Sequence, residues 1–162
     1  GDGSAVMREN FRVVDTVAYL DALCEIIQTT DMVPLLISGN SMAPFLVHRR
    51  DTVYLSALSR PLRRGDLVLF RRDNGAYVLH RVARLEKEGY CMVGDAQTEL
   101  EHGVRLDQIY AIAVAADRKG YHLQPGAFWW EFFEKIWIRV VPLRPLFSKV
   151  YGCFKVLREK KE

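Results

Sequence analysis

Apolar residues in the first segment recur at intervals of three and four from Phe11 to Ile27. This is the spacing of one face of an α-helix. The pattern predicts an amphipathic helix over residues 7–30. Asp31 and Pro34 end it, because the residue before a proline is pushed away from helical geometry.

Beyond Pro34 the pattern changes to short runs rich in β-branched and aromatic residues, separated by turn sequences. The strongest turn signal is Asn74-Gly75, since both residues tolerate the positive φ of a type I′ hairpin turn. The predicted strands cover residues 35–37, 52–55, 67–70, 77–85, 90–93 and 109–115. We therefore expect a mainly β fold, with a folded antiparallel or barrel-like sheet rather than a doubly wound one.

Residues 128–162 differ from both earlier segments, because they hold all three tryptophans among nine aromatic residues. They also carry eight Lys or Arg against four Glu, so this segment is the source of the net charge of +3. Pro142 and Pro145 are predicted to divide it into two short helices. Two interpretations stay open: the aromatic side chains pack on the sheet, or residues 128–154 contact a membrane surface or a protein partner.

These segments predict one domain. Residues 1–6 precede the first methionine and resemble an expression scar, 7–34 form a helix, 35–124 a β core, and 125–162 an aromatic, basic segment. A chain of 162 residues can bury a core without disulfides or metal. The basic charge is modest and confined to one segment, which argues against nucleic-acid binding.

The cysteines and histidines favour no metal and no cofactor. The three cysteines are odd in number and lack CxxC spacing, and the four histidines lack ligand spacing. No apolar run approaches the roughly 18 residues that cross a bilayer. We expect a soluble protein in the reducing cytoplasm, with peripheral membrane contact as the one alternative.

The run LLISGNSMAPFL, residues 35–46, breaks at a cluster of small and polar residues. A strand that ends in this way can present a hydroxyl at the end of a rigid element, as a nucleophile requires. Taken alone, Ser41 is more typical of a turn or a helix cap. In the same way His80 alone is more typical of a half-buried, hydrogen-bonded histidine on a strand.

Three more boxes follow in order: RRGDLVLF at 63–70, HRV at 80–82 and GD at 94–95. With SGNSMAP they resemble the signal peptidase I superfamily of serine peptidases, to which the self-cleaving SOS repressors are related. The resemblance covers roughly residues 35–115. Most bacterial members use a lysine base, whereas the HRV box is similar to the endoplasmic reticulum and archaeal branch, which uses histidine.

The resemblance implies Ser41 as nucleophile, His80 as general base and Asp95 as the acid that orients or electrostatically supports the base. A serine hydroxyl is a poor nucleophile unless a nearby base takes its proton. A histidine that is neutral near pH 7 suits that role, and a carboxylate on its other nitrogen would fix the tautomer. After GD, the family carries asparagines and a second aspartate. This chain has AQTELEHG instead, where Glu99 or Glu101 could substitute.

The oxyanion needs preorganised donors, of which the backbone N–H of Ser41 is the first. The second donor is either the Ser38 hydroxyl or the Asn40 amide. Met42 is expected to pack beneath the nucleophile or to line a pocket for small substrate side chains.

Two functions follow from these residues. The first is a serine endopeptidase that cleaves an extended leader or precursor peptide laid along a sheet edge. The second is a catalytically inactive module on the same fold that binds a peptide or a protein partner.

Overall fold

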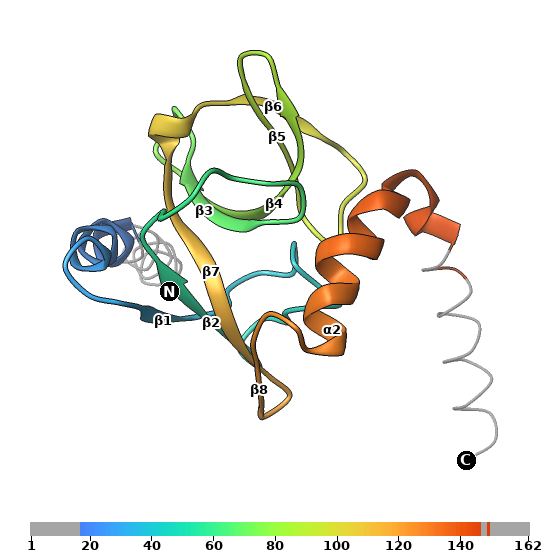
Figure 1. Ribbon diagram of the computed structural model, residues 1–162, viewed down its shortest axis with the longest axis horizontal. Helices are drawn as coiled ribbons and strands as arrows, with labels where there is room; N and C mark the ends of the chain where they lie inside the picture. Colours follow the sequence, from blue (N-terminus) through green and yellow to red (C-terminus); the bar gives the residue numbers. More distant parts are fainter. Residues whose placement is uncertain (1–16, 147–148, 150–162) are drawn as a thin grey trace, which may run out of the picture.

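A computed structural model describes residues 17–146 and 149. Eight strands form one antiparallel sheet in the order β1-β2-β7-β3-β4-β5-β6, with β8 paired to β7 (Figure 1). Their bounds are β1 Val33–Leu36, β2 Thr52–Ser56, β3 Leu67–Arg71, β4 Tyr77–Glu86, β5 Gly89–Val93, β6 Glu101–Val104, β7 Ile109–Arg118 and β8 Tyr121–Leu123. A short 3-10 helix, η1 (Leu106–Gln108), precedes β7. The expected mainly β, antiparallel fold is confirmed. The six predicted strands are all present, whereas β6 and β8 were not predicted.

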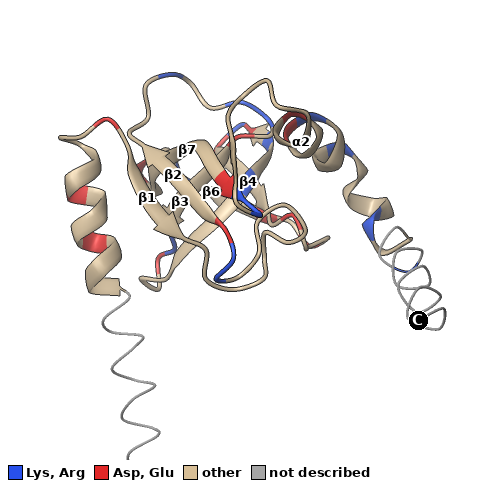
Figure 2. Cartoon of the chain, turned by 90° about the horizontal axis from the view of Figure 1, so that it is seen from below, with Lys and Arg blue, Asp and Glu red and all other residues tan. Residues whose placement is uncertain are grey.

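The N-terminal helix occupies residues 17–27 of the described chain and lies at the opposite end of the molecule from the C-terminal helical segment (Figures 1 and 2). The part of the predicted helix before residue 17 falls outside the described residues. Leu23 and Ile27 are buried against the sheet, as the amphipathic pattern requires. Pro34 does not border the helix, because it already belongs to the edge strand β1.

The β3–β4 hairpin places His80 beside a central strand. Its turn is not type I′ as predicted, since Gly75 has a positive φ of 91° but Asn74 does not. The Asn74 side-chain oxygen instead accepts a hydrogen bond from the Ala76 N–H at 3.0 Å. The resulting register pairs Val68 with His80.

The C-terminal segment is one nearly continuous helical run over residues 128–146. It comprises α2 Phe128–Glu131, a π-helical turn η2 Phe132–Ile136 and a 3-10 stretch η3 Trp137–Leu143. The prediction of two helices divided by prolines is wrong for the described residues. Pro142 lies inside η3, and the backbone departs from helical geometry at Val140, which is not a proline. No helix among the described residues is long and apolar enough to cross a membrane.

The inner side of this segment completes the main core. The Trp130 and Phe133 rings lie 6.0 and 4.9 Å from the Phe45 ring, centroid to centroid. Each fully buried side chain of this size stabilises the fold by about 1.5–3 kcal/mol. The segment is therefore an integral part of the domain, and it fixes the loop that carries Ser41.

Candidate active site

The loop that carries Ser41 follows β1 and is held from both sides. The Gly39 N–H donates to His48 Nδ1 at 2.8 Å, and Gly39 itself has a positive φ of 86°, which glycine adopts without strain. On the other side, Phe45 and Met42 are almost completely buried. Met42 is thus buried directly after Ser41 in the chain, and it also borders the cleft described next.

Ser41 and His80 line the same cleft, which has a volume of about 940 Å³. One wall comes from β1 and the loop after it, and the other from β3 and β4. The N-terminal helix closes one end with Tyr19 and Leu20. Most of the wall side chains are apolar, among them Leu35, Leu36, Ile37, Leu69, Val78 and Leu79.

Gly94 lies where the loop that carries Ser41 meets His80. A methyl carbon on Gly94 would be 2.5 Å from the Ser41 carbonyl oxygen and 3.1 Å from His80 Nε2. Because one methyl carbon would contact both, the Ser41 carbonyl oxygen and His80 Nε2 lie close together. Within the described chain, no hydrogen bond joins the Ser41 hydroxyl to the imidazole, although both residues line the cleft.

His80 is 4% exposed, and its ring packs edge-on against Phe70 at 6.2 Å. Burial lowers the pKa of His80 from its ordinary 6.5 to about 4; the charge of Arg72 lowers it further, and Glu101 opposes the shift. The imidazole is therefore neutral at pH 7 and can accept a proton. Its Nδ1 atom is buried without a hydrogen-bond partner in the described part of the chain.

Asp95 does not take the position expected of it. Its buried carboxylate receives Arg81 Nε at 2.9 Å and makes no hydrogen bond to His80 in the described structure. The reason is the strand pleat: His80 and Arg81 are consecutive residues of β4, so their side chains leave opposite faces, and Asp95 lies on the Arg81 face. Burial raises the pKa of the Asp95 carboxyl, and the Arg81 charge opposes that rise.

Glu101 is the carboxylate whose field reaches His80. Glu101 pairs with Arg72 at 2.7 Å, and both residues line a smaller hollow that His80 and Glu99 also border. Of Glu99 and Glu101, only Glu101 affects the His80 pKa, and it makes no hydrogen bond to the imidazole Nδ1 in the described structure.

The two alternatives for the second oxyanion donor are placed differently. Ser38 is exposed and lines the cleft with Ser41. Asn40 does not border the cleft, and its carbonyl oxygen accepts the Ala43 N–H at 3.2 Å. The geometry favours the Ser38 hydroxyl.

Arg144 is a site residue that sequence reasoning missed. It is 3% exposed, and its Nη1 atom donates to the carbonyl oxygens of Gly94 and Gln97, each at 2.8 Å. The Trp137 indole N–H donates to the Asp95 carbonyl oxygen at 2.8 Å. The clamped loop in turn donates the Ala96 N–H to the Ser41 carbonyl oxygen at 2.9 Å. No local sequence motif could reveal a clamp that spans about fifty residues.

One group of side chains in the described chain could hold a metal ion, although the sequence predicted none. Glu86, Cys91 and His102 come from β4, β5 and β6, and their donor atoms lie within 4.8 Å of one another. His102 Nδ1 already contacts the Glu86 carboxylate at 2.9 Å, and burial raises the pKa of the Cys91 thiol, with the Glu86 charge adding to the rise. These contacts account for the cluster without a cation.

Comparisons with protein-family models, with curated proteins and with solved structures found no match to this chain. The family resemblance therefore rests on the ordered boxes alone, and function must be argued from the geometry of the cleft.

Proposed function

We propose that this protein is a serine endopeptidase in which Ser41 is the nucleophile and His80 the general base. The observation that carries the proposal is their meeting in one cleft, where the His80 imidazole is buried and neutral at pH 7. Their lack of a hydrogen bond is compatible with this role, because catalytic contacts are often loose before substrate binds.

The substrate that fits this cleft is an extended peptide with apolar side chains. The Ile37 N–H donates to the Asp51 carbonyl oxygen, toward β2. Because the direction of backbone polar groups alternates along a strand, the N–H and C=O of Leu36 face the free edge of β1. Leu36 is 54% exposed and borders the cleft. A peptide added along this edge would gain backbone hydrogen bonds, while the apolar walls receive its side chains.

In the proposed reaction, the Ser41 oxygen attacks the scissile carbonyl carbon as His80 Nε2 takes the hydroxyl proton. The Ser41 N–H and the Ser38 hydroxyl stabilise the oxyanion. The imidazolium then gives its proton to the leaving amine, and the acyl-enzyme forms. Water, deprotonated by the same ring, hydrolyses the ester and restores Ser41.

Incubation with a pool of synthetic peptides of diverse sequence, followed by mass spectrometry, tests the proposal. We expect the wild type to generate cleavage products that Ser41→Ala and His80→Gln do not, because the loss of nucleophile or base lowers the rate by about 10³-fold or more. Ser59→Ala changes an exposed serine away from the cleft and is the matched control. Products that persist unchanged in Ser41→Ala would refute the assignment.

A second candidate function, a non-catalytic peptide-binding module, is favoured by one observation: the carboxylate expected to support His80 is occupied by Arg81. A module of this kind would bind peptides from the same pool equally well as wild type and as Ser41→Ala, and neither protein would cleave them. Cleavage by the wild type excludes it.

A further inference from the structure

The helical segment 128–146 has two apolar faces, and only one of them is used by the fold. The inner face is buried and includes Trp130, Phe133, Ile138 and Val141. We define the outer face by its most exposed apolar residues: Phe128 (71% exposed), Ile136 (54%), Leu143 (54%) and Leu146 (61%). Their spacing places them along one side of a helix.

We propose that this outer face docks on the surface of a lipid bilayer that contains anionic headgroups. The proposal concerns a surface outside the cleft and does not depend on Ser41 or His80. An amphipathic helix lies in the bilayer interface when large apolar side chains occupy one face and Lys or Arg flank it.

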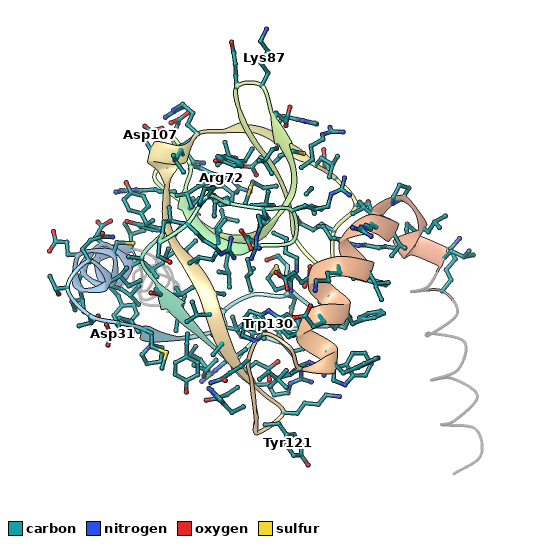
Figure 3. All side chains as sticks on the ribbon, in the orientation of Figure 1. Asp31, Arg72, Lys87, Asp107, Tyr121 and Trp130 are labelled. Atoms are coloured by element: carbon teal, nitrogen blue, oxygen red, sulfur yellow. The ribbon has the colours of Figure 1, made fainter. Side chains whose placement is uncertain are left out.

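Aromatic residues extend the outer face at its N-terminal end. Trp129 is 44% exposed beside Phe128, with their ring centroids 4.9 Å apart. The β7–β8 hairpin lies alongside, since the Arg118 guanidinium stacks over the Trp129 ring at 5.4 Å. At the tip of this hairpin, Tyr121 points away from the body of the molecule and is 75% exposed (Figure 3). Tryptophan and tyrosine are the side chains that prefer the headgroup level of a membrane.

Cations lie on and beside the outer face. Lys135 and Arg139 are exposed on the segment itself, and Lys135 is paired with Glu131. Arg63 lies near Lys135, because its charge lowers the Lys135 pKa that Glu131 raises. Figure 2 shows Lys and Arg along this segment together with the Glu residues of its first turns, whereas the N-terminal helix shows only Asp and Glu. Glu134 is turned inward and half-buried. Because Glu131 offsets the charge of Lys135, Arg139 and Arg63 supply the positive charge that is complementary to an anionic bilayer.

Co-sedimentation of the full chain with vesicles tests the proposal. We expect binding to vesicles of phosphatidylcholine and phosphatidylserine, and binding that is weaker by at least about tenfold to phosphatidylcholine alone or at high salt. The double variant Phe128→Ser/Ile136→Ser should lose at least about tenfold in vesicle affinity, because two apolar anchors are removed. Its matched control is Leu85→Ser/Leu106→Ser, which changes two similarly exposed leucines (55% and 56%) elsewhere on the surface and should bind as wild type does.

Tryptophan quenching by brominated lipid in the same vesicles gives a second measurement. Trp129 is the most exposed tryptophan, so we expect quenching in the wild type and its loss in Trp129→Phe. Failure of the wild type to bind anionic vesicles would overturn the proposal, as would equal loss in the control variant. A dimer that the Phe128→Ser/Ile136→Ser variant converts to monomer, without vesicle binding by the wild type, would show that the face joins two copies of the chain instead.

Discussion

Replacing Gly94 by alanine tests whether the arrangement of Ser41 and His80 is as tight as the structure shows. The new methyl carbon would lie 2.5 Å from the Ser41 carbonyl oxygen, 3.0 Å from Gln97 Oε1 and 3.1 Å from His80 Nε2. Ordinary van der Waals contact begins at 3.4 Å. The Gln97 side chain can rotate away, but the Ser41 carbonyl is backbone and is held by the Ala96 N–H. The nucleophile loop must therefore shift by about 1 Å.

This shift determines how much stability and how much activity the variant loses. Overpacking a well-filled site costs about 1–3 kcal/mol in the free energy of unfolding. A displacement of about 1 Å between reacting groups lowers the rate by about 10²-fold. We therefore expect Gly94→Ala to lose more activity than its stability explains, because the methyl group acts directly between the nucleophile loop and the base.

Urea unfolding measures the stability of this variant, and cleavage of a peptide identified from the pool measures its activity. Gly120→Ala is the matched control: its Cβ meets open space, but its φ of 82° makes alanine cost about 1–2 kcal/mol. The control should lose stability and keep its activity. Wild-type stability in Gly94→Ala would refute the tight contact, and a destabilised but fully active Gly94→Ala would refute the catalytic role of the juxtaposition.

Two further predictions concern the surroundings of the site. The pKa of His80 is about 4 in the folded state and about 6.5 when unfolded, so the unfolded chain takes up the proton first as the pH falls from 6.5 to 4. The free energy of unfolding should fall by up to about 3 kcal/mol through His80 in this pH window. Urea titrations at pH 7 and pH 4.5 should show a smaller fall for His80→Gln than for the wild type. An equal fall in both proteins would contradict the burial argument. Arg144→Met removes the donors to the Gly94, Gln97 and Trp137 carbonyl oxygens, which should cost about 2–4 kcal/mol. A change in urea unfolding below about 0.5 kcal/mol would show that the clamp is not needed.

Hydrophobic periodicity was sufficient to predict most strands of the sheet. The two strands that it missed, β6 and β8, show where it fails. The β6 sequence EHGV contains residue types that are depleted in strands and shows no apolar alternation. It becomes a strand because β5 offers it an edge, pairing Tyr90 with Val104. The three residues of β8 are likewise fixed by their pairing with β7. Such tertiary pairing leaves no signal in a local window.

The ordered sequence boxes predicted part of the candidate site. They identified Ser41 and His80, which the structure brings to one cleft. They also implied Asp95 as the partner of His80, but the box HRV places Arg81 next to the histidine, and a buried carboxylate requires a charged partner. Asp95 therefore pairs with Arg81, and the ordered boxes mark a structural ion pair as well as the candidate catalytic residues.

The C-terminal segment shows a different limit of sequence analysis. It is apolar on nearly all sides, so its pattern cannot say which face is buried. The packing of Trp130 and Phe133 on Phe45 decides the question and leaves the outer face free. The two interpretations that the sequence left open are thus not exclusive, since one face packs on the core and the other remains available for the proposed contact.

The environment of His80 also limits how catalysis could work here. An imidazole whose pKa is about 4 is neutral at pH 7 but is a weak base, so proton transfer from a serine hydroxyl to it is unfavourable. Arg72 and Glu101 are paired at 2.7 Å, so their opposite charges offset one another at His80, and burial dominates. In the proposed reaction, stabilisation of the oxyanion by the Ser41 N–H and the Ser38 hydroxyl would then have to supply most of the rate enhancement. In a cleft that a bound peptide closes to water, such preorganised donors are at their strongest.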